Sequence, residues 1–339
     1  MVTIKKDSKW PLVGNGHIVE YLKKSIATNH ISGCYIFYGP DDIGKGTLAG
    51  FFAKSLVCCD MRGDTIPCGI CESCVQADKG IHGDITVLEK EADKKNILVD
   101  QVREFIRILS MSSFLNSYKI GIIRQAENLS EKAFNALLKT LEEPKDKVVI
   151  ILMTSKIELL LPTIVSRSQI LRFNPVNPND IYDYLLTEKK ASRSSAKIFS
   201  RLCLGRPALA VKLIEDKDFF KDYQEKIKVF LELIKTDYNQ RLDKIEKLAG
   251  RNSIGQESTE SAKKIIGIWQ GLTRDLLLIK LEQPDLIQHQ IVEKDLNILA
   301  SKISIKLLIK CARLLNEAKM YLNANVNYRV VLDNLSLQI

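Results

Sequence analysis

The chain has 339 residues, 45% of them hydrophobic and 27% charged, which is ordinary for a globular protein. This length favours two or three domains over one small core. No apolar run approaches the ~18 residues of a membrane-spanning helix, and the N-terminal MVTIKKDSKW lacks the apolar region of a signal peptide. We therefore expect a cytoplasmic protein with no membrane partner. The net charge of +9 fits contact with nucleic acid, and it also fits a lysine-rich solvated exterior.

The first half of the chain alternates short apolar runs with amphipathic stretches. Runs that are apolar on both faces and separated by helices are typical of a parallel sheet covered on two sides. We therefore predict an α/β domain over residues 1–175. Its predicted strands are Tyr35–Tyr38, Asp84–Leu88, Lys119–Ile123, Val148–Met153 and Gln169–Phe173, and its predicted helices are 14–28, 46–57, 98–110, 130–142 and 157–165.

Residues 34–47, CYIFYGPDDIGKGT, place a glycine-rich loop between a strand and a helix. Gly39, Gly44 and Lys45 match the P-loop, in which backbone N–H groups and a helix N-terminus hold phosphates and the lysine neutralises them. The alternative is that the two glycines only shape a strand-to-helix turn.

The same loop departs from the pattern that binds Mg-nucleotide. A Ser or Thr should follow the lysine to bind magnesium, but this chain has Gly46. Thr47 comes one residue late, about 100° further round the helix. Asp41 and Asp42 also bring negative charge toward the phosphate position. We therefore do not expect ATP to bind tightly.

Five of the eight cysteines lie in CCDMRGDTIPCGICESC. Counting from Cys59, the spacing is C-x8-C-x2-C-x2-C, with Cys68, Cys71 and Cys74. Disulfides are not expected in the cytoplasm, whereas four thiolates can close the tetrahedral shell of a structural zinc ion. The alternatives are free thiols or a redox pair, and Cys58 could replace Cys59 as a ligand.

Residues 118–147 read as a buried strand followed by an amphipathic helix. A nucleotide-hydrolysing enzyme of this build ends that strand with Asp-Glu, to hold magnesium and polarise water. This chain has Arg124-Gln125 instead, and Glu127 lies past the strand end. Arg124 places a positive charge where Mg²⁺ would lie, and Gln125 cannot act as a base. With Gly46, these residues indicate a nucleotide-site scaffold that has lost hydrolysis.

Two later positions could sense phosphate. Thr154 follows the fourth strand, where it either senses a γ-phosphate or caps the strand. Ser166, Arg167 and Ser168 form a polar break in LPTIVSRSQILRF. From these residues alone, Arg167 is either a solvated surface charge or an arginine finger.

The second half of the chain is predicted to be helical. After the turn-rich segment NPVNPND, short helices are expected at 179–187, 192–203 and 207–216, followed by a helical bundle. The predicted domains are 1–175 with a cysteine-rich insert at 58–75, then 176–218, then 219–339.

In combination, CYIFYGPDDIGKG, the cysteine insert, FNALLKTLEEP and LPTIVSRSQ resemble the bacterial clamp-loader subunits of DNA polymerase III, which are AAA+ proteins. The resemblance covers residues 10–175 by motif, and the rest by length and helical character. The family has an ATPase type, tau/gamma, with a complete P-loop and an Asp-Glu pair. It also has a delta-prime type, often with a degenerate nucleotide site. Gly46 and Arg124-Gln125 make this chain similar to the second type.

The resemblance implies roles for particular residues. It implies structural zinc at Cys59 with the three later cysteines, because the x8 spacing matches the family. It implies that Arg167, in a Ser-Arg-Cys motif whose cysteine is here Ser168, acts in trans at a neighbouring subunit's ATP. Arg206, in GRPALA, falls near the family's second sensor position; the alternative is a surface arginine at a helix start.

The resemblance also implies partners. Residues 176–218 would be a three-helix lid, and residues 219–339 a collar that assembles a pentameric ring. The expected partners are tau/gamma ATPase subunits and a delta subunit. The sliding clamp and primed DNA would be contacted through the complex, with the chain supporting clamp loading during replication.

Two other functions remain open. In the first, the chain is an active tau/gamma-like ATPase, with Thr47 and Glu127 standing in for the missing residues. In the second, it is a stand-alone zinc-dependent nucleic-acid binding protein. ATP turnover and co-purification of partners distinguish these functions, whereas zinc content does not.

Overall fold

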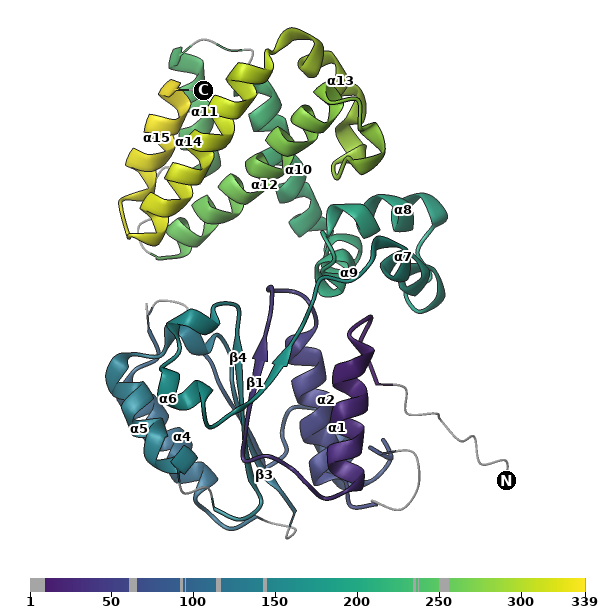
Figure 1. Cartoon of the computed structure of the whole chain (residues 1–339), viewed down its shortest axis with the longest axis vertical. Coiled ribbons are helices and arrows are strands. Elements are labelled where there is room, and N and C mark those ends of the chain that lie inside the picture. The colour runs from purple at the N-terminus through teal and green to yellow at the C-terminus, as the bar shows by residue number, and fades with distance from the viewer. Residues whose placement is uncertain are drawn as a thin grey trace. The chain divides into compact units, whose positions relative to one another are not determined.

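A computed structural model describes residues 10–60, 66–91, 94, 96–113, 117–142, 145–233, 236, 238–249 and 256–338. The chain forms two compact units, one of Met1–Asp180 with Arg206–Ala208 and one of Ile181–Gly205 with Leu209–Ile339 (Figure 1). The domain boundaries at 175 and 218 stay predictions. Among the described helices, none combines the length and apolar character that a bilayer crossing requires.

The first unit is built on a five-stranded sheet in the order β2-β3-β4-β1-β5, and all its strand pairs are parallel. This confirms the predicted fold class. Ile36 of β1 lies opposite Leu152 of β4 and Ile170 of β5, so β1 has partners on both sides. The strands are β1 Cys34–Tyr38, β2 Ile85–Leu88, β3 Lys119–Ile123, β4 Val148–Thr154 and β5 Gln169–Arg172.

Helices cover both faces of this sheet: α1 and α2 lie on one face, and α4, α5 and α6 on the other (Figure 1). The reason is the alternation of side chains along buried strands. Tyr35 and Phe37 of β1 belong to one apolar cluster with residues of α1 and α2, while Ile36 belongs to the other. The helical elements of this unit are α1 Gly16–Ala27, α2 Lys45–Val57, α3 Glu72–Asp78, α4 Val99–Leu109, η1 Ala126–Asn128, α5 Glu131–Glu142, η2 Ile157–Leu159 and α6 Pro162–Val165.

Two details differ from the sequence prediction. The helix predicted at 157–165 is wrong as one element, because the structure has the short η2 and then α6. Pro162 explains the break: it has no N–H to continue a helix but fits the first position of a new one. Helix α3, inside the cysteine-rich insert, was not predicted.

The remaining elements are helical, as predicted. Trp269 of α12 is fully buried, its ring centroid lies 5.8 Å from that of Phe230, and its Nε1 donates to the backbone oxygen of Lys226 at 3.0 Å. The elements are α7 Pro178–Thr187, α8 Arg193–Leu202, α9 Pro207–Glu215, α10 Lys217–Leu233, α11 Tyr238–Ala249, α12 Gln256–Lys280, η3 Pro284–Leu286, η4 Gln290–Val292, α13 Glu293–Lys302, α14 Ile305–Asn323 and α15 Tyr328–Gln338.

A buried polar network joins α10, α12 and the segment before η4. Asp275 and His289 are both fully buried, and Oδ2 of Asp275 lies 2.7 Å from Nδ1 of His289. The backbone N–H groups of Gln288 and His289 donate to the same carboxylate. Nε2 of His289 lies 3.0 Å from the hydroxyl of Tyr223. The carboxylate therefore has polar partners despite its burial, as a buried charge requires.

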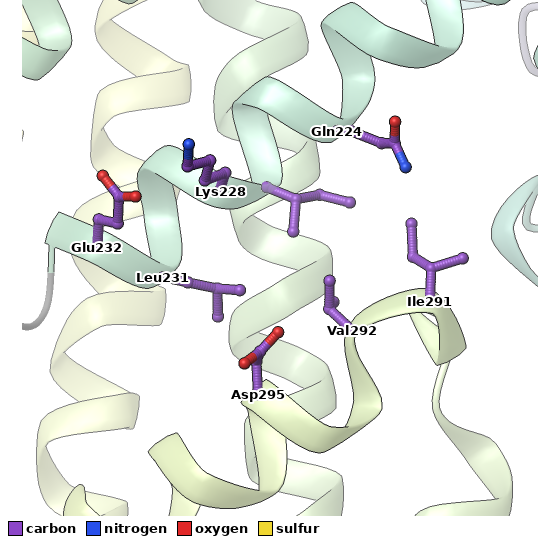
Figure 2. A pocket seen from close by; sticks show the side chains of 8 residues that line it. Gln224, Lys228, Leu231, Glu232, Ile291, Val292 and Asp295 are labelled. Carbon is purple, nitrogen blue, oxygen red and sulfur yellow. The ribbon is translucent and has the colours of Figure 1, made fainter.

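The second unit also contains a cavity of about 310 Å³, in which Leu231 of α10 lies across from Ile291 and Val292 (Figure 2). Lys228 and Asp295 add opposite charges to its lining. No residue predicted to be functional from the sequence lies among the lining residues, which are Gln224, Ile227, Lys228, Leu231, Glu232, Ile291, Val292 and Asp295.

Candidate functional site

The glycine-rich loop follows β1, which lies between β4 and β5 in the sheet. Gly39 has φ 156°, and a Cβ at this position would lie 2.6 Å from the backbone oxygen of Phe173. Its N–H donates to the backbone oxygen of Thr154 at 3.2 Å. Gly44 precedes α2 with φ 104°. Both glycines are thus required by the backbone itself, whatever the loop binds.

Lys45 makes its contacts inside the loop. The side chain is only 6% exposed, and Nζ donates to the backbone oxygens of Gly39 and Pro40. Nζ also lies 3.6 Å from Oδ1 of Asp41. Burial lowers the pKa of Lys45, while the charge of Asp41 opposes this shift. An ammonium group has three N–H donors. In this conformation, atoms of the loop occupy the donors of Lys45 that a bound phosphate would require.

The positions that would hold magnesium carry no suitable ligand in this structure. Gly46 has no hydroxyl, and Thr47 is exposed. Arg124 lies at the end of β3, where its Nη1 lies 2.9 Å from Oε2 of Glu89. Gly46 and Arg124 line one cavity of about 190 Å³. Both residues depart from the pattern of an ATPase in the sequence. They are 78 residues apart in the numbering, and the fold brings them to the same cavity.

Glu127 and Thr154 have local structural contacts. Oε1 of Glu127 accepts from the N–H and the hydroxyl of Ser155, at 3.3 and 2.8 Å, which joins η1 to the end of β4. Its Oε2 is buried and has no hydrogen-bond partner among the described residues. Thr154 is 1% exposed, and its Oγ1 accepts from the N–H of Lys156 at 3.0 Å. Thr154 therefore makes the strand-end contact that was one of its two predicted roles.

Arg167 lies just after α6, with its side chain 42% exposed. Nη1 donates to the backbone oxygen of Thr163 at 3.2 Å, and Nη2 lies 3.2 Å from Oε1 of Glu142. Ser166 and Ser168 also bond back to this short helix: their hydroxyls donate to the backbone oxygens of Thr163 and Ile164. Of these three consecutive residues, the arginine alone presents a charge to solvent.

Arg206 belongs to the short segment 206–208 that the contacts assign to the first unit. The N–H of Ala208 donates to the backbone oxygen of Asp42 at 3.0 Å, so this segment adjoins the glycine-rich loop. The role of Arg206 as a sensor stays a prediction.

The cysteine-rich insert brings four sulfur atoms together, and one of them differs from the prediction. The Sγ atoms of Cys58, Cys68, Cys71 and Cys74 all lie within 4.8 Å of one another. Cys59 is exposed, and its Sγ lies 3.1 Å from the hydroxyl of Ser73. The choice of Cys59 over Cys58 is thus corrected. Helix α2 ends at Val57, and the extended backbone at Cys58 directs consecutive side chains to opposite sides.

The local backbone supports negative charge on these sulfurs. Each of the N–H groups of Cys68, Cys71 and Cys74 lies 3.4 Å from a cluster sulfur, and Cys71 caps the N-terminus of α3 in this way. Burial raises the pKa of the Cys58 and Cys74 thiols. Burial acts in the same direction on Cys71, but hydrogen bonds to its sulfur lower its pKa to about 6.

The spacing of the sulfurs fits a zinc ion. Zn–S bonds of about 2.3 Å in a tetrahedron separate the sulfurs by about 3.8 Å. Cys68 and Cys74 have their sulfurs 3.9 Å apart. Four thiolate donors without an open position are typical of structural sites, and N–H groups aimed at the sulfurs are typical of the surroundings of bound metals.

The sequence did not identify the carboxylates that hold the two arginines. Glu89 pairs with Arg124 and Glu142 with Arg167, each from a distant part of the sequence. Glu142 lies within the motif FNALLKTLEEP, which was the available signal. Neither pairing can be read from spacing along one helix or strand.

A parallel sheet in this strand order, a P-loop after β1 and a mostly helical C-terminal region define an AAA+-type protein. The family described as DNA polymerase III, delta subunit, matches residues 14–177. Residues 14–177 of the chain are therefore similar to clamp-loader subunits of DNA polymerase III.

Named relatives show the same similarity. The subunit delta' of Bacillus subtilis is 30% identical over 213 residues, which are 63% of this chain and 63% of that protein. The subunit delta' of Pseudomonas aeruginosa is 40% identical over 133 residues, or 39% of this chain and 40% of that protein. The subunit gamma/tau of Mycobacterium bovis is 34% identical over 168 residues, 49% of this chain and 28% of that protein. The chain thus spans less than two thirds of the length of each.

Among solved structures, a protein of Thermotoga maritima related to the DNA polymerase III gamma subunit has a TM-score of 0.48 at 19% identity. The match covers 94% of this chain and 97% of that chain.

Proposed function

We propose that this chain is a delta-prime-type subunit of a cytoplasmic clamp loader. It would join tau/gamma ATPase subunits and a delta subunit, and support loading of the sliding clamp onto primed DNA. The relatives named delta' support the subunit type. The observation that carries the proposal is the contrast between its two phosphate-related sites: the loop has no magnesium ligand at position 46, whereas Arg167 presents its guanidinium to solvent.

In this proposal the chain does not hydrolyse ATP. Phosphoryl transfer from ATP requires a metal-holding carboxylate and a group that orients water. At the end of β3 the chain has Arg124, whose cationic head repels Mg²⁺ and is paired with Glu89. Glu127, the substitute considered from the sequence, is engaged with Ser155. The contacts of Lys45 within the loop argue in addition against tight ATP binding.

Arg167 is proposed to act in trans. A guanidinium that enters a neighbour's ATP site stabilises the charge that develops on the transferred phosphoryl group, and such a residue raises kcat by about 10³–10⁵. The contacts of Ser166 and Ser168 fix the backbone on both sides of Arg167 without covering its side chain. Ser166 therefore has a structural part in presenting the arginine.

The cysteine cluster is proposed to hold structural zinc through Cys58, Cys68, Cys71 and Cys74. The metal would cross-link the end of α2 to the start of α3 and would take no part in phosphoryl transfer. Lys54 of α2 and Asp78 of α3 add an ion pair at 2.6 Å between the same two helices.

The test is ATP hydrolysis by the purified chain, alone and then mixed with tau/gamma, delta, clamp and primed DNA. We expect no magnesium-dependent turnover alone, and a stimulated rate in the mixture. Arg167→Ala should lower that rate by at least tenfold while the ring still assembles. Arg103→Ala is the matched control, because Arg103 is also exposed and ion-paired, with Asp100 at 3.2 Å.

Two results would overturn the proposal. Turnover by the chain alone would make it an active ATPase subunit. An unchanged rate with Arg167→Ala in a fully assembled complex would remove the trans role of the arginine.

A further inference from the structure

We propose that Glu142 is a positioning residue for Arg167, an inference that rests on the trans role of Arg167 proposed above. Glu142 is the last residue of α5, and Arg167 follows α6. Oε1 of Glu142 lies 3.2 Å from Nη2 of Arg167. The glutamate thus holds the guanidinium from a different helix, in addition to the contact that the arginine makes with its own turn.

The two helices that carry this pair are anchored in one core. Leu141, next to Glu142, is 8% exposed, and Ile164 of α6 is fully buried; both belong to the same apolar cluster. The backbones on both sides of the ion pair are therefore fixed by packing. The side chains of Glu142 and Arg167 extend from these backbones into solvent, at 48% and 42% exposure.

The pair leaves the arginine able to bind a phosphate. A guanidinium has five N–H donors in a fixed fork. Thr163 engages Nη1 and Glu142 engages Nη2, so at most two of the five N–H groups are used among the described residues. The remaining donors can bond to phosphate oxygens while the first contacts persist. In this geometry Glu142 can hold the arginine in place without competing with the phosphate for its donors.

Holding the side chain lowers the entropy lost when the neighbour's ATP is engaged. A free arginine samples many rotamers, and a pre-oriented one loses fewer of them at the transition state. An ion pair between exposed groups is weak, so the expected effect is modest. Loss of Glu142 should lower kcat about two- to fivefold, against the loss of at least tenfold for Arg167→Ala.

A double-mutant cycle in the reconstituted complex tests this inference. The variants are Glu142→Gln, Arg167→Ala and the combination, with Glu142→Asp as the conservative replacement. Glu131→Gln is the control, because Glu131 is an exposed residue in the first turn of the same helix. The partner ATPase is measured for kcat and for KM toward ATP, and complex assembly is checked by size-exclusion chromatography.

We expect Glu142→Gln to lower kcat two- to fivefold with KM unchanged, and to have no further effect in the Arg167→Ala background. Glu142→Asp should fall between wild type and Glu142→Gln, and Glu131→Gln should match wild type. A rate that rises with Glu142→Gln would mean that the pair sequesters the arginine, and would overturn the inference. An equal loss in both backgrounds would also overturn it, because Glu142 would then act independently of Arg167. If Arg167→Ala itself has no effect, the proposed function fails first.

Discussion

Exchanging the two adjacent cysteines one at a time tests the cysteine cluster most directly. Cys58→Ser removes a sulfur that lies within 4.8 Å of the three others. Cys59→Ser changes an exposed side chain whose contact is with the hydroxyl of Ser73. The two variants make the same chemical change at neighbouring positions, so each serves as the control for the other.

The expected magnitudes differ strongly. Zinc binding by structural sites contributes about 10–16 kcal/mol in zinc-finger peptides. Divided evenly among four ligands, one thiolate corresponds to roughly 2.5–4 kcal/mol, or roughly 60- to 700-fold in zinc affinity. Cys59→Ser should stay within about 0.5 kcal/mol of wild type, as exposed substitutions usually do.

The assay is zinc affinity by competition with a chromogenic chelator, with zinc content by elemental mass spectrometry and thermal unfolding beside it. We expect Cys58→Ser to lose zinc at chelator concentrations that leave wild type and Cys59→Ser loaded, and to melt at a lower temperature. Selective loss by Cys59→Ser would refute the geometry and restore the ligand chosen from sequence spacing. If neither variant changes zinc content or stability, the cluster holds no structural metal.

Two buried groups give further predictions. His289→Ala should destabilise the fold by about 3 kcal/mol in denaturant unfolding, because it removes a buried side-chain partner of the Asp275 carboxylate and leaves a cavity beside it; Tyr223→Phe should cost only about 1 kcal/mol, and equal losses would contradict this reasoning. Burial lowers the pKa of His82, with Asp84 opposing the shift, so below about pH 6.5 the unfolded chain takes up a proton that the folded chain does not. Stability should therefore fall as pH drops from 7 toward the depressed pKa, and His82→Gln should make this fall shallower; equal slopes of melting temperature against pH would argue against it.

The strands could be predicted closely because each is a short apolar run bounded by polar residues. β3 has the predicted bounds Lys119–Ile123, and all five of its residues are buried. Periodicity was less informative where proline divides an apolar segment, as at Pro162, or where a helix is only seven residues long, as α3 is. In such short segments, the bounds of a helix depend on where a single turn ends, and the amino-acid composition does not predict that position.

In the candidate site, too, the sequence could not predict where individual side chains lie. Spacing predicted a four-cysteine cluster but could not decide between Cys58 and Cys59, because that choice depends on where α2 stops and which way the next residue points. The ion pairs of Arg124 with Glu89 and of Arg167 with Glu142 join residues 35 and 25 positions apart in the numbering. These contacts follow from how the strands and helices are placed, so they became visible only in the folded chain.

The P-loop residues also have a structural role that does not depend on a nucleotide. A side chain at Gly39 would collide with the backbone of Phe173, which follows β5, and Gly44 has a backbone conformation that favours glycine. Lys45 bonds to two carbonyl groups of the loop and so helps to close it. The three motif residues therefore stabilise the junction of β1, β5 and α2. Gly46 and Arg124 have no such role in the loop, and they are the positions on which the proposed loss of hydrolysis rests.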